Sequence, residues 1–204
     1  MRIAGPARVN CPHCGARHDC ELVQSINTRD DPATKQRLLA GELNVLACSC
    51  GKRTQLIATL LFHDPVADYF CQVCPGGEAA MAEAALGFRA AGTSGTQRLV
   101  PTQNALVEKV KLLDAGLADW AIEMTKVLLL APGGDLDRVL LFERADDELL
   151  HWVRFDDGMP VPAASPRAAY AKLAESTSAP PYDELQIDRA WAVLAVQQLI
   201  AAGN

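Results

Sequence analysis

The sequence is poor in aromatic residues and has no long uninterrupted apolar run. Phe, Trp and Tyr make up 5% of the 204 residues although 50% of the residues are hydrophobic, so alanine and leucine supply much of the apolar content. A membrane-spanning helix needs about 18 or more consecutive apolar residues, and no segment offers them. Residues 1–10 also lack the apolar core of a signal peptide. We therefore expect a folded, cytoplasmic protein without a membrane partner.

An excess of positive charge and the common catalytic signatures are lacking as well. The formal net charge is −6, and residues 1–60 hold eight Lys and Arg against five Asp and Glu. Four metal-bound thiolates would cancel most of that small basic excess, so we do not expect a nucleic-acid partner. Gly133-Gly134 lacks the Gly-Lys-Ser/Thr of a phosphate loop, and four scattered histidines offer no Ser-His-Asp set. We expect no catalytic residue and no organic cofactor.

The seven cysteines are the most informative residues. In Cys11-Pro-His-Cys14-Gly15, Pro and Gly bend the backbone so that two thiolates point to one place, as in a zinc knuckle. Cys48-Ser-Cys50-Gly51 offers a second pair, with one residue instead of two between its cysteines. In the cytoplasm such cysteines are reduced thiols or metal ligands rather than disulfides. The expected ligands of one structural zinc ion are Cys11, Cys14, Cys48 and Cys50.

The remaining cysteines offer alternatives. Cys20 is a reserve ligand, with His13 and His18 behind it, although beside an apolar strand it has the pattern of a small core residue. Cys71-Gln-Val-Cys74 has the spacing of a thiol–disulfide exchange site or of a further knuckle. In a strand, however, residues three positions apart point to opposite faces, so core packing is the favoured interpretation.

Hydrophobic periodicity predicts an α+β fold. The expected strands cover residues 20–27, 54–62, 69–73, 97–100, 138–144 and 149–155. The expected helices cover residues 31–39, 78–91, 102–114, 117–130, 166–175 and 188–202. Asp31-Pro32 is a typical helix start, Gly41 a typical stop, and Ser165-Pro166 a start for the fifth helix.

We expect these elements to form an N-terminal zinc ribbon, about residues 9–60, with a helical insertion. The ribbon would run into a small antiparallel sheet, packed on a hairpin of helices 102–114 and 117–130 and on the C-terminal helices. Residues 1–134 are the expected first domain. Residues 135–204, a β-hairpin followed by helices, are expected to pack onto it.

Charged and aromatic residues in the predicted helices and strands have simpler interpretations. Glu123 and Lys126 are three positions apart, which suits a surface ion pair on one helix. The alternative is a buried carboxylate cluster that includes Asp114 and Asp119. The three tryptophans lie in apolar elements and are expected in the core rather than at a base-stacking surface; they are Trp120, Trp152 and Trp191.

Motifs over residues 9–130 occur in a specific order. They are Cys11-Pro-x-Cys14-Gly15, Ser25-Ile26-Asn27, Asp31-Pro32, Leu38-Leu39-x-Gly41-x-Leu43-Asn44, Cys48–Gly51, Leu60–Asp64, Val107–Val110, Leu117-Ala-Asp119 and Ile122-Glu123-x-x-Lys126. With this set the chain resembles the CpXC family, a bacterial and archaeal family named for its Cys-Pro-x-Cys knuckles. The resemblance implies a ribbon-like knuckle pair at the four cysteines named above and implies no activity. The second knuckle departs from the family pattern, because it lacks the proline and one residue.

A non-enzymatic module that docks a protein partner, or another copy of itself, is the leading hypothesis for function. The first alternative is an enzyme, either a thiol-redox protein using Cys71 and Cys74 or a hydrolase using an incompletely ligated zinc. The second alternative is a nucleic-acid-binding ribbon. Its basic contacts would be Arg8, Arg17, Lys52 and Arg53.

Overall fold

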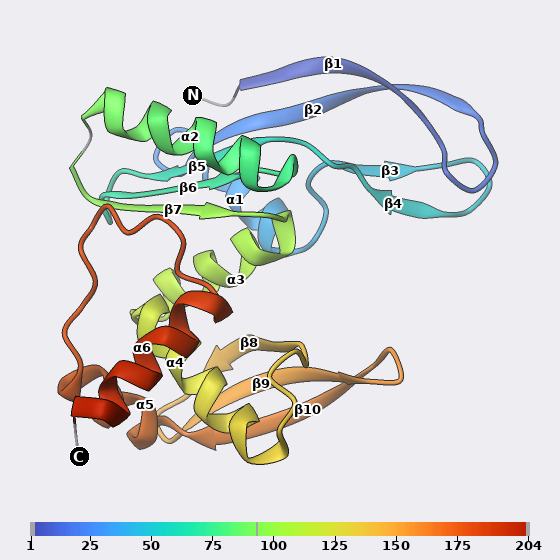
Figure 1. Cartoon of the computed structure of the whole chain (residues 1–204). Coiled ribbons are helices and arrows are strands. Elements are labelled where there is room, and N and C mark those ends of the chain that lie inside the picture. Colours follow the sequence, from blue (N-terminus) through green and yellow to red (C-terminus); the bar gives the residue numbers. More distant parts are fainter. Residues whose placement is uncertain (1–2, 93, 203–204) are drawn as a thin grey trace. The chain divides into compact units, whose positions relative to one another are not determined.

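The computed structural model describes residues 3–92 and 94–202, and it confirms an α+β fold (Figure 1). The chain folds into two compact units, Met1–Val107 and Glu108–Asn204. The domain boundary expected after residue 134 stays a prediction. Among the described helices, none is both long enough and apolar enough to cross a membrane.

A mixed five-stranded sheet forms the framework of the first unit, with strand order β1-β2-β5-β6-β7. The strands are β1 (Ile3–Asn10), β2 (Arg17–Asn27), β5 (Leu60–Asp64), β6 (Tyr69–Val73) and β7 (Thr96–Val100). The pairs β1–β2 and β5–β6 are antiparallel, whereas β2–β5 and β6–β7 are parallel. The prediction of an antiparallel sheet is therefore wrong. Long connections after β2 and after β6 give the chain room to return in the same direction, as parallel pairing requires.

Helices lie on both faces of this sheet (Figure 1). They are α1 (Pro32–Leu39), α2 (Gly77–Ala91) and the start of α3 (Gln103–Asp114). The rings of Phe70 in β6 and Phe88 in α2 meet edge to face at 6.5 Å, which places α2 on the face that carries Phe70. Asp64 in β5 points to the opposite face, because side chains alternate along paired strands. There it forms an ion pair with Lys35 of α1, with an N–O distance of 3.7 Å.

The strand predicted over residues 54–62 is interrupted. Its first part belongs to β4 (Arg53–Gln55), which pairs with β3 (Val45–Ala47), and its last part belongs to β5. The Asn44 side chain stands in for a neighbouring strand: its Oδ1 accepts a hydrogen bond from the Val23 N–H at 2.8 Å, and its Nδ2 donates to the Val23 carbonyl at 2.9 Å. The Asn44 carbonyl also accepts the Leu56 N–H at 2.7 Å, so the pairing around the break involves residues distant in the sequence, and strand propensity alone does not predict it.

Two hairpins extend together to one side of the sheet (Figure 1). One is the far end of β1–β2 and the other is β3–β4; we call residues 8–20 and 44–56 the cysteine arm. A small apolar cluster joins the hairpins. Its buried members are Cys11, Leu46 and Cys48, with Val9, Ala16 and Leu56 packed against them. The arm therefore carries both sequence-predicted knuckles on separate hairpins that meet at their ends.

Gly95, in the turn before β7, approaches the backbone of Asp68 closely. Its φ is 92°, and a Cβ added to it would lie 2.3 Å from the Asp68 carbonyl oxygen. We expect Gly95→Ala to lower the free energy of unfolding by about 2–4 kcal/mol, because the backbone must shift and a left-handed conformation is strained. Gly92→Ala is the matched control: φ is 59° but a Cβ there meets nothing within 4 Å, so only about 1 kcal/mol is expected. Equal losses for the two variants in denaturant unfolding would contradict the close approach.

A three-stranded antiparallel sheet, in the order β10-β9-β8, belongs to the second unit. Its elements are α4 (Asp119–Leu130), β8 (Leu140–Ala145), β9 (Leu149–Asp156), β10 (Met159–Pro166), α5 (Arg167–Ser176) and α6 (Arg189–Ala202). The predicted hairpin is confirmed, but the helix start predicted at Ser165-Pro166 is wrong. Both residues end β10, and the helix begins one position later. The prolines of β10 are tolerated because it is an edge strand that pairs only with β9.

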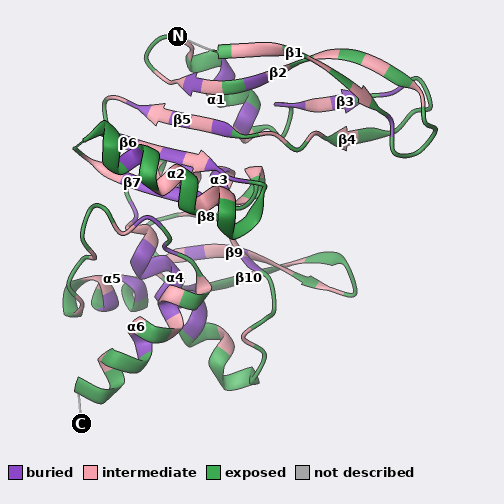
Figure 2. Ribbon diagram, turned by 45° about the horizontal axis from the view of Figure 1, so that its top comes forward, coloured by how far each residue is buried: buried purple, intermediate pink, exposed green. Residues whose placement is uncertain are grey.

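The core of the second unit, formed by residues that are purple in Figure 2, contains both apolar and charged side chains. Trp120 and Trp152 are buried in it, as predicted, whereas Trp191 is half-buried. The predicted surface position of Glu123 and Lys126 is wrong. Lys126 is 3% exposed, and its Nζ lies 2.8 Å from carboxylate oxygens of both Glu123 and Glu108.

The burial of this ion cluster has a direct electrostatic consequence. Burial lowers the pKa of Lys126, but the carboxylates of Glu123 and Glu108 raise it more, so its pKa lies above the ordinary value. Glu108 also accepts a hydrogen bond from the Phe142 N–H at 2.5 Å, which ties α3 to β8. Lys126 is therefore charged in the folded protein and connects two helices through two acids.

Candidate metal centre

Four thiols lie together at the end of the cysteine arm. Cys11 and Cys14 come from the turn between β1 and β2, and Cys48 and Cys50 come from the turn between β3 and β4. All four Sγ atoms lie within 4.8 Å of one another, with 3.5 Å between Cys14 and Cys48 and 3.8 Å between Cys11 and Cys50. Sulfurs held tetrahedrally at 2.3 Å from a zinc ion lie about 3.8 Å apart, so this donor set fits such an ion. The structure thus brings the four predicted residues together; that they bind metal stays a prediction.

Local backbone geometry explains how each knuckle turns. Gly15 and Gly51 have φ of 74° and 81°, and their N–H groups donate to the carbonyls of Cys11 and Cys48 at 2.8 and 2.9 Å. A left-handed φ is readily adopted by glycine, which is why each cysteine pair is followed by one. The two turns close in the same way even though the second knuckle is one residue shorter.

Every sulfur accepts a hydrogen bond from the backbone N–H two residues further along the chain. The donors are His13 for Cys11, Ala16 for Cys14, Cys50 for Cys48 and Lys52 for Cys50. Cys11 also accepts a second hydrogen bond, from the Cys14 N–H, that Cys48 lacks, so the irregular second knuckle keeps only part of the hydrogen-bond pattern of the first. Such bonds favour the thiolate, which is the form of cysteine that binds metal.

The acidities of the thiols differ because the four groups share hydrogen bonds. The Cys50 N–H lowers the pKa of Cys48 to about 7 despite the opposing effect of burial. The Ala16 N–H acts to lower the pKa of Cys14, but hydrogen bonds with the Cys48 and Cys11 thiols and burial together raise it to about 12. A metal ion that binds all four sulfurs must therefore displace protons.

His18 contacts this cluster in a way that the sequence did not indicate. As a possible reserve ligand it lies outside the group of four sulfurs, and its Nε2 is 3.2 Å from the Cys48 Sγ. It pairs with Val9 across the hairpin and faces the inside of the arm. Groups that hydrogen-bond a metal ligand orient it and tune its affinity.

Removal of the His18 side chain is expected to weaken metal binding without abolishing it. His18→Ala should lower zinc affinity about 10- to 100-fold, the range found for groups that support a ligand through a hydrogen bond. His13→Ala is the control, because His13 is exposed and only its backbone contacts a sulfur. Zinc competition at one fixed pH measures both variants; equal affinities for the two would show that the His18 contact has no role.

The other cysteines lie outside the cluster. The thiol of Cys20 donates to the Ala7 carbonyl at 3.5 Å. Cys71 lies opposite Phe62 on one face of the sheet, whereas Cys74 lines a cavity on the other face, beneath α2. Burial raises the pKa of Cys74, which disfavours the reactive thiolate. As the strand pattern predicted, the two cysteines are not positioned to react with each other.

Arg8, Arg17 and Arg53 do not form one face of the arm, and Lys52 is exposed directly before β4. Arg8 and Arg17 alternate with His18 along β1–β2, so they point away from the thiols. Arg53 lies next to the Leu46–Thr54 pair, whose Leu46 is buried, so it points outward from the other hairpin. Arg8 is also paired with Asp19 at 2.8 Å. These three arginines are therefore divided between two outer surfaces, whereas a nucleic-acid-binding ribbon needs a contiguous basic face.

Comparison with protein families agrees with the resemblance noted in the sequence. Residues 9–126 match the family described as CpXC protein. This stretch includes both knuckles and ends within α4. Neither a curated protein nor a solved structure matches the chain. Because the match covers more than half of the chain, this protein belongs to the CpXC protein family.

Proposed function

We propose that this protein is a non-enzymatic protein-interaction module whose cysteine arm is held together by one structural zinc ion. The observation that carries the proposal is the group of four cysteine sulfurs within 4.8 Å of one another. Tetrahedral sulfur sets are typical of zinc. In both knuckles the first cysteine accepts a hydrogen bond from the backbone N–H two residues further on, which supports a site built by both hairpins.

A structural rather than catalytic role follows from the number of ligands. Four sulfurs complete the tetrahedron, whereas a catalytic zinc keeps one position for water or substrate. The arm has only a small apolar cluster, and short hairpins are marginally stable on their own. Zinc binding would therefore supply much of the free energy that orders the arm.

A protein partner, or a second copy of the chain, is favoured over the alternatives. The acidic net charge and the divided basic residues disfavour nucleic acid. The separation of Cys71 and Cys74 onto opposite faces disfavours a thiol-redox enzyme. The four arm cysteines are present as thiols and form no disulfide, which suits the reducing cytoplasm, where we place the protein.

Metal content and thiol accessibility test the zinc site. Protein purified without chelator and without a histidine tag is expected to contain one zinc per chain. Its four arm cysteines should resist alkylation until a chelator is added. Metal-free protein in which Cys71 and Cys74 are reactive or disulfide-bonded would reject the proposal and favour the redox enzyme.

Affinity capture with two forms of the protein tests the interaction role. Zinc-loaded wild-type protein and a Cys14→Ser/Cys50→Ser variant are compared as baits in cell extract, alongside light scattering of each alone. We expect a retained protein, or self-association, that depends on the zinc-loaded arm. If wild type and variant retain the same proteins and both stay monomeric, the zinc-dependent module is rejected.

A further inference from the structure

An extended stretch of chain leads into β5, and its residues Ile57 and Ala58 have no neighbouring strand among the described residues. Residues 56–59 contain no helix, turn or bend, and their exposure alternates as in a strand: Leu56 and Ala58 are half-buried, whereas Ile57 and Thr59 are exposed. Within the described residues, the backbone N–H and C=O groups of Ile57 and Ala58 form no hydrogen bond. Unpaired strand backbone of this kind is a template for another strand.

The side of this stretch next to β6 is open. β5 and β6 pair as far as Leu60 and Val73, and the residues that follow β6 then turn away from β5. The N–H of Cys74 donates to the Val100 carbonyl at 2.8 Å, and Pro75 has no N–H to donate. On the other side, the Asn44 side chain already occupies the edge of β2. A further strand is therefore accommodated where β6 would have continued.

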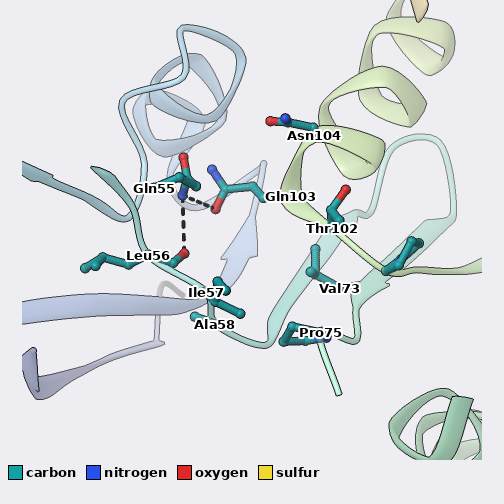
Figure 3. A pocket seen from close by; sticks show the side chains of 10 residues that line it. Gln55, Leu56, Ile57, Ala58, Val73, Pro75, Thr102, Gln103 and Asn104 are labelled. Atoms are coloured by element: carbon teal, nitrogen blue, oxygen red, sulfur yellow. Dashed lines mark hydrogen bonds between the residues drawn. The ribbon is translucent and has the colours of Figure 1, made fainter. Parts of the chain in front are cut away.

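A cavity of about 330 Å³ occupies this open side (Figure 3). Its walls are Gln55–Ala58 on one side and Val73, Pro75 and Pro101–Asn104 on the other. The volume is at the lower end of the range of about 300–1,000 Å³ that is usual for ligand pockets. Ile57 contributes to the wall although its side chain is 82% exposed. The cavity is thus large enough for one side chain of a bound segment, and it lies along the unpaired backbone.

The chemistry of the cavity selects an uncharged occupant. None of its ten lining residues is ionisable, so a buried charge would find no counter-charge there. Gln55 donates to the Gln103 side chain at 3.2 Å and so joins the two walls at one end of the cavity, and Gln103 donates to the Leu43 carbonyl at 3.1 Å. The Asn104 carboxamide has no hydrogen-bond partner among the described residues and offers both a donor and an acceptor at the start of α3.

We propose that Ile57 and Ala58, together with this cavity, bind an extended and uncharged segment of a partner protein by strand addition. The backbone of the segment pairs with the one of these two residues whose N–H and C=O groups face the cavity, one apolar side chain enters the cavity, and Asn104 binds a neighbouring polar group. The inference rests on the proposed interaction role and adds to it the binding site and the chemistry of the partner.

Capped peptides and nuclear magnetic resonance test the proposal on the full, zinc-loaded chain. The probes are N-acetylated, C-amidated heptapeptides with Ser, Thr and Asn at the flanks and Ala, Val, Leu or Met at the centre. We expect at least one to bind with a dissociation constant below about 1 mM and to shift the amide signals of residues 57–59 and Asn104. Replacement of its central residue by Asp or Lys should abolish those shifts. If no neutral peptide moves these signals, or if the charged peptides bind equally well, the proposal is wrong.

Two proline variants provide a matched pair. Consecutive residues of a strand direct their N–H groups to opposite sides, so only one of Ile57→Pro and Ala58→Pro removes a donor that faces the cavity. In that variant the dissociation constant of the best peptide should rise about tenfold or more. In the other variant it should stay within about threefold of the wild-type value. Neither N–H is bonded in the folded chain, so zinc content and thermal unfolding should stay close to wild type in both. Equal effects of the two prolines would overturn strand addition.

The outcomes separate this site from the interaction role itself. If a captured partner binds without moving the signals of residues 57–59, the site is wrong and the role stands. If zinc is absent or no partner exists, the role fails independently of the peptide result. If those signals move with protein concentration alone, a second copy occupies the site and the proposed partner segment is wrong.

Discussion

Serine in place of Cys48 is expected to lower the affinity of the protein for zinc at least about 100-fold. The Cys48 Sγ lies 3.5 Å from that of Cys14, and Cys48 is one of the two buried cysteines of the cluster. Apparent binding free energies of structural zinc sites are about 10–16 kcal/mol, so the loss of one ligand in four costs about 3 kcal/mol. Competition with a chromophoric chelator measures the affinity.

Cys20→Ser is the control for this change. Cys20 is in the same hairpin as the first knuckle, but its thiol donates to the Ala7 carbonyl instead of joining the cluster. The variant is expected to hold one zinc with wild-type affinity. If Cys20→Ser lowered the zinc affinity and Cys48→Ser did not, Cys20 rather than Cys48 would be the ligand, and the proposed ligand set would be refuted.

Methionine in place of Lys126 is expected to lower the free energy of unfolding by about 3–5 kcal/mol, because it leaves two buried carboxylates without a counter-charge. The side chains of Glu108 and Glu123 are only 11% and 8% exposed, so water cannot replace the lost ammonium group. Denaturant unfolding measures the loss. The triple variant K126M/E108Q/E123Q should regain most of it, since a glutamine at position 108 still accepts the Phe142 N–H. A triple variant no more stable than K126M would contradict the electrostatic explanation.

The same cluster makes a specific pH dependence testable. Because the folded-state pKa of Lys126 is raised, its stabilisation is fully present below the ordinary lysine value of 10.5 and is lost as pH rises through the folded-state pKa. The stability difference between wild type and K126M should therefore hold from neutral pH to about pH 10.5 and shrink above it. A difference that is unchanged well above that pH would indicate that packing, not charge, is responsible.

Features that depend on neighbouring residues were predictable from the sequence. The four thiols were found because Pro, Gly and the short spacing act within a few positions of each cysteine. Helix starts were found for the same reason: the Asp31 carboxylate accepts the Thr34 N–H at 3.0 Å, and the Thr102 hydroxyl accepts the Ala105 N–H at 3.2 Å. Such signals lie within a few residues of one another, so they can be recognised in the sequence without knowledge of the fold.

Features that depend on distant residues were missed. The burial of Lys126 results from the approach of α3, α4 and β8, and spacing on one helix gives no sign of it. The β10 strand was missed because its prolines normally argue against a strand, and only its edge position permits them. The contact of His18 with Cys48 joins two hairpins, so it depends on their register and not on either sequence alone. The parallel strand pairs were missed because direction is set by connections rather than by strand residues.

The placement of the sulfurs on two separate hairpins has a consequence for how the arm responds to its surroundings. Cys14 and Cys48 are 34 positions apart, so an ion between them joins segments that are otherwise held mainly by a small cluster. An ion that binds only the ordered arm stabilises it in proportion to the logarithm of its free concentration, about 1.4 kcal/mol for each tenfold increase. The order of the arm would then follow the supply of metal, independently of the stability of the sheet that carries it.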